Sequence, residues 1–327
     1  MKNKTILITG GTGSWGHELV KQLLPKNPRE IRILSRNEAS QVEMQRYFEN
    51  NSKLKFIIGD IRELDGLMKA SEKVDYVYHL AALKHVPICE HQPYEALKTN
   101  IIGTQNVIEA AIANKVNKVI YISTDKAANP ANFYGMTKAI GEKLIIHANL
   151  LNSDTKFVCV RGGNVLGTNG SVIHVFKNQI QKGYVGITDK RMTRFFLTLE
   201  DAIKLLFKAT DEAQGGEIFV MKMPTCKILD LAEVLMEASG KKDVKIKELG
   251  IRPGEKLHEI LLSEFESDST VYFDNEYFVI LPTIKIEGLY EHYSTFKKVE
   301  LKSYSSSENL MTKEEIKKML EKGRFLP

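Results

Sequence analysis

The stretch that decides the fold lies at the start of the chain, where Thr5 to Gly16 reads TILITGGTGSWG. Thr5 to Ile8 is a short apolar and β-branched run, and an amphipathic segment follows the glycines as far as Leu24. In this strand, turn and helix, one glycine permits the tight turn, one lets the backbone approach a pyrophosphate, and one lets the helix pack on the strand. The helix N-terminus offers free N–H groups to the phosphates. We therefore expect a dinucleotide cofactor to contact the turn through Gly10, Thr12, Gly13, Ser14, Trp15 and Gly16.

The end of the second expected strand, Ile31 to Leu34, is followed by Ser35 and Arg36. In dinucleotide folds an acidic residue here holds the ribose 2′-hydroxyl, whereas an arginine accommodates a 2′-phosphate. The alternative is that Arg36 is an ordinary solvated residue. The sequence therefore favours NADP over NAD, with Ser35 and Arg36 as cofactor contacts.

The first half of the chain continues to alternate strands with helices. Phe56 to Gly59 reads as a third strand and Val74 to Leu80 as a fourth, and Pro93 to Asn114 has helical spacing, as one long helix or two shorter ones. Short connections between such elements indicate an α/β fold with a doubly wound parallel sheet. The residues that follow the third and fourth strands are further candidate cofactor contacts, namely Asp60, Ile61, Ala81 and Ala82.

The stretch Ser123 to Lys138, STDKAANPANFYGMTK, carries the candidate chemistry. It follows the apolar run KVIYIS, which looks like a buried parallel strand, and open α/β sheets place their ligands at the carboxyl ends of such strands. If a helix begins near Phe133, Tyr134 and Lys138 lie on one face, one turn apart. A neighbouring cation favours the phenolate, so Tyr134 could act as a base near neutral pH.

Asp125 and Lys126 add an acid and a second amine to this group. With NADP in place, Tyr134 can remove a hydroxyl proton while hydride leaves the same carbon. The resulting ketone acidifies the adjacent C–H, so a base can take that proton while an acid protonates a leaving hydroxyl one carbon further on. Asp125 and Lys126 can supply these roles if burial and proximity shift their protonation.

The second half of the chain has a less regular pattern. Phe157 to Val160 reads as a sixth strand, and residues 171–182, 199–213 and 228–239 read as helices, with a strand at 217–221. Residues 270–282 read as two short strands, and Thr312 to Glu315 matches a capping box before a terminal helix. We expect an NADP-binding domain over residues 1–165 with a returning segment near 188–222, and an interleaved substrate-binding domain over 166–187 and 223–327.

Composition narrows the function classes. The 327 residues are 43% hydrophobic and 27% charged, which is typical of a globular protein, and the formal charge of +5 favours small anionic substrates and gives no case for nucleic acid. Cys89, Cys159 and Cys226 form no CxxC pair, and no apolar run approaches 18 residues, so we expect a cytoplasmic protein without a membrane span. His85, Cys89 and His91 invite a metal interpretation, but no second ligand cluster exists, so we expect no metal.

Several motifs together resemble the extended short-chain dehydrogenase/reductases, and within them the inverting UDP-N-acetylglucosamine 4,6-dehydratases of bacterial glycan biosynthesis. The resemblance covers nearly the whole chain. It rests on the following stretches: TGGTGSWG (9–16), ILSRNE (33–38), GDIRE (59–63), AALKHVP (81–87), KTNIIGTQNV (98–107), TDKAANPAN (124–132), YGMTK (134–138) and RPGEKLHE (252–259). Epimerases usually carry Ser or Thr pairs at the strand end and retaining dehydratases carry Asp-Glu, so Asp-Lys points to elimination with inversion at C5.

The resemblance implies a role for each residue of the site. Asp125 would be the acid for water loss, Lys126 the base at C5 and Tyr134 the base for oxidation at C4. Lys138 would partner Tyr134 and contact the ribose, Thr124 would hold the sugar hydroxyl, and NADP would not be consumed. By the same resemblance, Lys84 and Asn100 would contact the cofactor. The expected substrate contacts are Lys84, His85, Asn164, Ser171, Arg194, Arg252 and Glu255, with arginine suited to phosphate oxygens.

The chain departs from the family pattern at two places near the expected substrate. It has Gly162 where a tyrosine is common and Asn169 where an arginine is common.

The alternatives to an inverting dehydratase are a UDP-sugar 4-epimerase, a retaining dehydratase, or a non-catalytic NADP-binding sensor or scaffold. The family likeness also implies a homo-oligomer, either a dimer or a hexamer.

Overall fold

The computed structural model describes residues 1–151, 154–168 and 170–326 and begins with the predicted strand, glycine turn and helix, β1 (Thr5–Thr9) and α1 (Ser14–Leu23). Two of the glycines are required by close packing. Gly10 has φ +68°, and a Cβ there would lie 2.7 Å from the Cα of Ala81. A Cβ on Gly16 would lie 1.9 Å from the carbonyl oxygen of Gly11. The turn can therefore approach the neighbouring strand end, and α1 can pack on β1, only because these side chains are absent.

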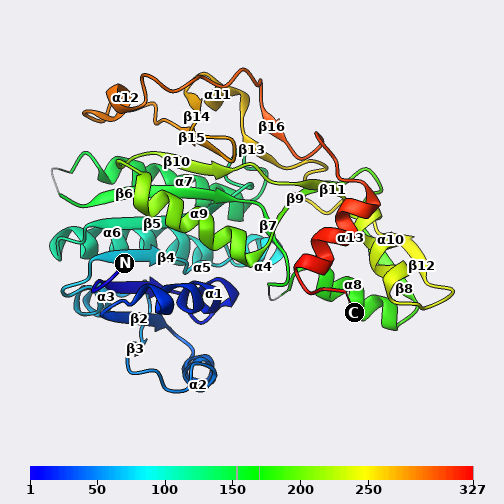
Figure 1. Ribbon diagram of the computed structural model, residues 1–327, viewed down its shortest axis with the longest axis horizontal. Coiled ribbons are helices and arrows are strands. Elements are labelled where there is room, and N and C mark those ends of the chain that lie inside the picture. Colours follow the sequence, from blue (N-terminus) through cyan, green and yellow to red (C-terminus); the bar gives the residue numbers. More distant parts are fainter. Residues whose placement is uncertain (152–153, 169, 327) are drawn as a thin grey trace.

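A nine-stranded sheet forms the centre of the described part of the chain, in the order β14-β15-β10-β6-β5-β4-β1-β2-β3 (Figure 1). From β10 to β3 all neighbours are parallel, whereas β14 and β15 are antiparallel. The predicted doubly wound fold is thus confirmed. The strands after β1 are β2 (Glu30–Ser35), β3 (Leu54–Ile58), β4 (Tyr76–His79), β5 (Lys118–Thr124), β6 (Lys156–Gly162), β10 (Ile218–Met221), β14 (Thr270–Tyr272) and β15 (Tyr277–Ile280).

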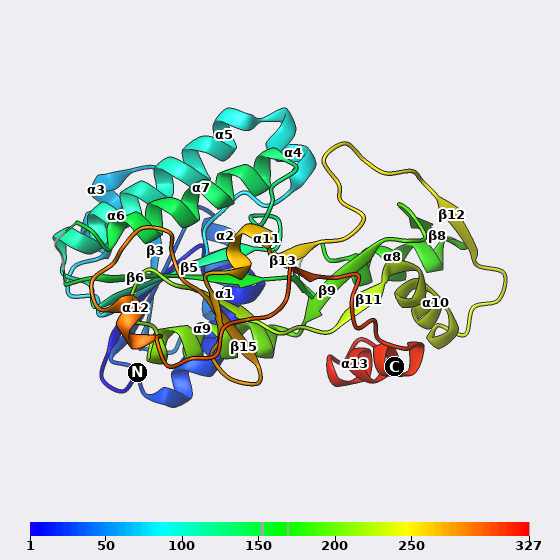
Figure 2. The ribbon, with the colours of Figure 1, turned by 90° about the horizontal axis from the view of Figure 1, so that it is seen from above.

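Helices cover both faces of this sheet (Figure 2). One face carries α3 (Leu64–Ala70), α6 (Gly103–Ala113) and α7 (Phe133–Ala148), and the other carries α1 and α9 (Leu199–Glu212). Along β5 the side chains alternate between the two layers, since Val119 and Tyr121 pack under α6 and α7 while Ile120 packs under α1 and α9. Helix α2 (Glu38–Tyr47) packs beside β2 and β3, and the 3-10 turn η1 (Leu24–Lys26) follows α1.

The segment predicted as one or two helices, residues 93–114, is α5 (Pro93–Leu97), a π-helical turn η2 (Lys98–Ile102) and α6 in direct succession. It is preceded by α4 (Val86–His91). π-helical turns occur mostly as single insertions, frequently at functional sites. Here the turn carries Thr99 and Asn100, both buried, toward the loop after β4.

A second lobe lies beside the carboxyl ends of the parallel strands and has its own apolar core (Figure 1). Its sheets are β7 with β9 and β11, and β8 with β12, and β13 pairs with β16 between the lobe and the large sheet. Their bounds are β7 (Asn164–Val165), β8 (Tyr184–Ile187), β9 (Thr193–Leu197), β11 (Thr225–Lys227), β12 (Lys245–Glu248), β13 (Ile260–Leu262) and β16 (Tyr304–Ser305). The helices of the lobe are α8 (Val172–Gln181), α10 (Ile228–Ala238) and α13 (Lys313–Lys322). The single turns α11 (Glu264–Ser267) and α12 (Leu289–His292) lie instead beside β14 and β15 of the large sheet (Figure 1).

The two parts of the chain are interleaved. Within the returning segment 188–222, β10 joins the large sheet and α9 packs on its face, whereas β9 belongs to the second lobe. The two strands expected at 270–282 are present as β14 and β15, but they extend the large sheet. The predicted capping box before α13 is present, with Thr312 and Glu315 each bonding the other's backbone N–H. Among the described residues, no helix is both long enough and apolar enough to cross a membrane.

Candidate active site

A cavity of about 710 Å³ runs along the carboxyl ends of the parallel strands, between the large sheet and the second lobe. It brings together most of the side chains singled out from the sequence, although they come from separate loops. These are Gly10, Thr12, Gly13, Ser14, Trp15, Ser35, Arg36, Asp60, Ile61, Ala81, Ala82, Lys84, His85, Thr124, Lys126, Tyr134, Lys138, Asn164 and Ser171. A cavity at the point where the strand order reverses is the usual ligand site of a doubly wound sheet.

Two of the predicted cofactor contacts do not line this cavity. Gly16 is buried against Gly11, so its role is to let α1 pack closely on the glycine turn. Asn100 is also buried, and its amide accepts from the backbone N–H of Leu83 at 2.8 Å and donates to the carbonyl of Leu83 at 2.9 Å. It also donates to the hydroxyl of Thr137 at 2.9 Å. Asn100 therefore fixes the loop after β4 against α7, and any effect on a ligand passes through that loop.

Arg36 lies at the end of the cavity bordered by Asp60. Its guanidinium is 3.9 Å from Asp60 Oδ2, while Arg62 Nε donates to the same oxygen at 2.8 Å. Burial alone would raise the pKa of Asp60, but the hydrogen bonds and charge of Arg62 lower it. Since Asp60 is bound mainly by Arg62, the half-exposed Arg36 side chain is left to meet an anionic group in the cavity.

The polar residues after β5 form a hydrogen-bonded group. Asp125 is 1% exposed, and its Oδ1 accepts from Lys126 Nζ at 3.0 Å and from the hydroxyl of Thr124 at 2.8 Å. Its Oδ2 is buried without a hydrogen-bond partner. Asp125 thus lies behind the cavity wall, whereas Thr124 and Lys126 line it. A buried carboxylate with a free oxygen is a high-energy arrangement and is typical of functional sites.

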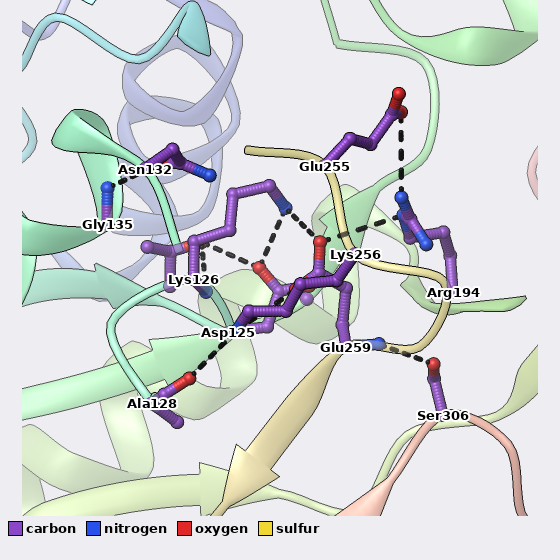
Figure 3. Close-up of polar contacts among 12 residues, drawn as sticks. Asp125, Lys126, Ala128, Asn132, Gly135, Arg194, Glu255, Lys256, Glu259 and Ser306 are labelled. Atoms are coloured by element: carbon purple, nitrogen blue, oxygen red, sulfur yellow. Dashed lines mark hydrogen bonds and ion pairs between the residues drawn. The ribbon is translucent and has the colours of Figure 1, made fainter. Parts of the chain in front are cut away.

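Lys126 has a second carboxylate partner. Its Nζ is 3.3 Å from Oε1 of Glu259, which precedes β13 and is 3% exposed (Figure 3). Burial alone would lower the pKa of Lys126, but the negative charges of Asp125 and Glu259 outweigh it and raise the pKa. In this arrangement Lys126 is an ammonium held between two carboxylates.

The helix predicted near Phe133 is α7, which begins there because Asn132 caps it by accepting from the N–H of Gly135 at 2.8 Å. The charges around Tyr134 differ from the predicted arrangement. Burial raises its pKa to about 12, and the cation that opposes this is Lys126. Lys138 Nζ lies 3.8 Å from the centre of the Tyr121 ring, and burial lowers its pKa to about 7. The four-residue spacing places Tyr134 and Lys138 on one face of α7, as predicted. The Lys138 amine, however, packs beneath the helix against the Tyr121 ring of β5.

The predicted substrate contacts fall into two groups. Lys84, His85, Asn164 and Ser171 line the cavity, whereas Arg194, Arg252 and Glu255 do not. Arg194 is 5% exposed, and its guanidinium lies 3.7 Å from Glu255 and 3.8 Å from Glu259. Arg252 is exposed on the loop before β13.

One of the two departures from the family pattern, Gly162, lies in the described part of the chain. Gly162 lines the cavity beside Trp15, where a Cβ would lie 3.8 Å from the indole. Space therefore exists for a larger residue to begin there. Asn169 lies outside the described residues.

The sequence assigned no role to Glu259 and Lys256, which contact the loop after β5 (residues 125–132). It also assigned none to Asn132 at the end of that loop. Their signal was present, because two lie in RPGEKLHE and the third in TDKAANPAN, the stretches that carried the resemblance. The lining residues without a predicted role include the polar side chains of Asn37, Thr99, Ser123 and Thr168. Within residues 1–151, 154–168 and 170–326, no three His, Cys, Asp or Glu side chains are grouped closely enough to hold a metal ion.

Comparisons with known proteins show which family the chain belongs to. The model of a family described as polysaccharide biosynthesis protein matches residues 6–281. Over 287 residues the chain is 47% identical to the inverting UDP-N-acetylglucosamine 4,6-dehydratase of Campylobacter jejuni, which covers 86% of this chain and 84% of that protein. It is also 47% identical over 268 residues to a UDP-glucose 4-epimerase of Rickettsia prowazekii, covering 80% and 78%.

The fold has a close counterpart among solved structures. The crystal structure of Pen from Bacillus thuringiensis superposes with a TM-score of 0.91 and 41% identity, covering 98% of this chain and 99% of that one. The family model, the sequence relatives and the solved structure each match most of the chain. The chain belongs to the polysaccharide biosynthesis protein family, as its resemblance to the inverting dehydratases of the extended short-chain dehydrogenase/reductases predicted.

Proposed function

We propose that the chain is a lyase, an inverting UDP-N-acetylglucosamine 4,6-dehydratase that uses bound NADP. The product would be UDP-2-acetamido-2,6-dideoxy-β-L-arabino-hex-4-ulose. One observation carries the proposal: the buried Asp125 carboxylate is paired with Lys126 at 3.0 Å beside Tyr134, at the wall of a cavity that the glycine turn also lines. An oxidoreductase needs only the tyrosine, so the added acid and amine favour elimination.

The nicotinamide cofactor would lie along the glycine turn. The backbone there approaches the loop after β4 so closely that no Cβ fits at Gly10, and the residues at the N-terminus of α1 line the cavity, where a helix N-terminus favours phosphate groups. Relatives of the fold have been solved with NAD, including a UDP-glucuronic acid 4-epimerase from Bacillus cereus at 28% identity. The half-exposed Arg36 supports NADP for this chain, because a guanidinium pairs well with a 2′-phosphate.

Tyr134 would take the proton of the C4 hydroxyl while Thr124 holds the sugar hydroxyl. When bound, NADP supplies a hydride acceptor for C4 and later returns the hydride to C6. The positive charge of Lys126 favours the Tyr134 phenolate against the opposing effect of burial. Lys138, with a pKa near 7, can exchange a proton at neutral pH and would partner Tyr134 and the ribose.

Elimination needs a neutral Lys126 and a protonated Asp125. A single proton transfer from Lys126 Nζ to Asp125 Oδ1, across 3.0 Å, provides both at once and leaves the net charge of the pair unchanged. Lys126 would then take the C5 proton while Asp125 protonates the leaving C6 hydroxyl. Return of a proton to the opposite face of C5 would invert its configuration.

The substrate would extend from this pair toward the second lobe. Lys84, His85, Asn164 and Ser171 line that end of the cavity, and Arg194, Arg252 and Glu255 would reach the uridine diphosphate from β9 and the loop before β13. We further propose that residues 1–165 and 188–222 hold mainly the cofactor, that 166–187 and 223–327 hold mainly the substrate, and that the protein is a homo-oligomer.

The test is to incubate the purified protein with UDP-N-acetylglucosamine in heavy water and to examine the product by NMR. We expect an L-configured 4-keto-6-deoxy sugar with deuterium at C5. The similarity to a UDP-glucose 4-epimerase makes epimerisation the second candidate. A simple 4-epimer without loss of the C6 hydroxyl would overturn the proposal, and a D-configured 4-keto product would identify a retaining dehydratase.

A further inference from the structure

The segment Gly254 to Glu259 crosses the loop after β5 (residues 125–132) and contacts it at three separate points. Figure 3 draws the contacts that Lys256 and Glu259 make. Asn132 Nδ2 donates to the carbonyl of Gly254 at 2.9 Å, and Lys256 Nζ donates to the carbonyl of Ala128 at 3.0 Å. The third contact joins Glu259 to Lys126 at 3.3 Å. The first two contacts fix the position of the segment, and the third reaches a side chain of the proposed chemistry.

Glu259 is held firmly enough to fix its partner. Its side chain is 3% exposed, its backbone N–H donates to the hydroxyl of Ser306 at 2.9 Å, and its carbonyl accepts from the N–H of Ser306 at 2.9 Å. Its Oε1 lies between Lys126 Nζ at 3.3 Å and Arg194 Nε at 3.8 Å. Its Oε2 is buried without a hydrogen-bond partner. A buried carboxylate in this position has little freedom to leave Lys126.

We propose that Glu259 is the positioning residue of the dehydration: it orients Lys126 Nζ and stabilises the ammonium that forms when Lys126 takes the C5 proton. This inference rests on the proposed function. A lysine amine sits on a flexible four-carbon stem, so a base built from it needs a second contact to fix its direction. Asp125 provides one contact from the end of β5, and Glu259 provides the other from the segment before β13.

The proton balance gives the two carboxylates different tasks. Before elimination, the Lys126 N–H proton moves to Asp125, and the neutral amine keeps its contact with ionised Glu259. During elimination the C5–H bond breaks and a new N–H bond forms on Lys126. At the same time Asp125 gives its proton to the departing C6 hydroxyl, which leaves as water. Asp125 and Lys126 end as an ion pair, the state the structure contains, with Glu259 ionised throughout.

Several charged and titratable groups surround the Lys126 ammonium. The groups that face its ammonium are Asp125 at the end of β5, Tyr134 on α7, Arg194 on β9, and Lys256 and Glu259 on the segment before β13. Arg194 lies within 4 Å of Glu259 and offsets its charge. Because Glu259 is an anion next to Lys126, it makes loss of the shared proton to solvent harder.

Glu259→Gln tests this role, because it keeps the size and one oxygen acceptor but removes the charge. The rate of dehydration should fall roughly 10- to 100-fold, less than the 10²–10⁴ that a positioned acid or base itself contributes. Reduction of the bound cofactor on mixing with substrate, seen in ultraviolet absorbance, should be nearly unchanged, since it depends on Tyr134. The alkaline limb of the pH–rate profile should move down by about one pH unit or more, because Lys126 loses an anion that holds its proton.

Glu259→Asp and Glu255→Gln separate this role from a structural one. The shorter carboxylate should restore the alkaline limb even where its rate is low. Glu255→Gln removes the other carboxylate near Arg194 but none next to Lys126, so it should change KM and leave the alkaline limb in place. A Glu259→Gln enzyme with an unmoved alkaline limb, or one that loses cofactor reduction in parallel with dehydration, overturns the inference. A wild-type enzyme that only epimerises overturns the proposed function and this inference with it, whereas wild-type dehydration with an unmoved limb overturns the inference alone.

Discussion

Replacing Asp125 by Asn tests the division of labour within the catalytic pair. The carboxylate lies 3.0 Å from Lys126 Nζ and is almost fully buried. At an effective dielectric constant of about 20, a charge pair at this distance attracts by roughly 5 kcal/mol, which is an upper limit because relaxation of the site weakens the attraction. Loss of this attraction should lower the pKa of Lys126, although Glu259 remains nearby as a second anion.

The variant should lose the acid and retain the base. We expect dehydration to fall by about 10²–10⁴-fold, since an amide cannot release a proton to the C6 hydroxyl. NADP binding and reduction of the bound cofactor by substrate should persist. In heavy water, NMR should detect deuterium at C5 of a sugar that keeps its C6 hydroxyl, because the amine of Lys126 is then easier to deprotonate.

The control is Asp65→Asn, which removes an exposed carboxylate from α3 and should behave as wild type. Unchanged dehydration in Asp125→Asn would remove Asp125 from the mechanism. If C5 exchange disappears together with dehydration, Asp125 acts through Lys126 and the separate acid role is refuted.

Three further changes test the cofactor site, the oxidation and the packing. Arg36→Ala should weaken NADP binding about 10- to 100-fold and leave NAD binding unchanged, as measured by fluorescence titration; equal loss for both would contradict a 2′-phosphate contact. Tyr134→Phe should abolish reduction of bound cofactor by substrate in stopped-flow absorbance, and persistent reduction would assign the C4 proton to another base. Arg161→Ala should lower the free energy of unfolding by about 3–5 kcal/mol in urea, because Glu142 and Glu266, now 2.7 and 2.8 Å from the guanidinium, would stay buried without a cation; a loss below 1 kcal/mol would show that they relax to solvent.

The sequence predicted the parts of the site that depend on near neighbours along the chain. Glycines that no side chain could replace marked the turn, and alternating strands and helices gave the parallel sheet. Asn132 and Thr312 begin their helices through local caps, which propensity and spacing can reveal. Because the carboxyl ends of parallel strands meet at one edge, the residues after several strands were expected to share a cavity, and most of them line it.

Other features of the site depended on packing that the spacing of residues does not reveal. The four-residue spacing of Tyr134 and Lys138 was correct for α7, yet the Lys138 amine packs on Tyr121, and the cation that lowers the pKa of Tyr134 is Lys126. Asn100 was expected at the cofactor but is bound to the loop after β4 through a π-helical turn. These outcomes depend on the directions of long side chains in a packed interior.

By itself, the sequence determined the doubly wound sheet, the glycine turn and the identity of the Asp125–Lys126 pair. Only the tertiary structure decided which charges face that pair, because Glu259 and Arg194 reach it from distant parts of the chain. Periodicity and turn chemistry depend on residues a few positions apart, whereas the protonation of a buried group depends on every charge within a few ångströms. The charge on Lys126 is therefore a property of the folded chain, set where the segment before β13 crosses the end of β5.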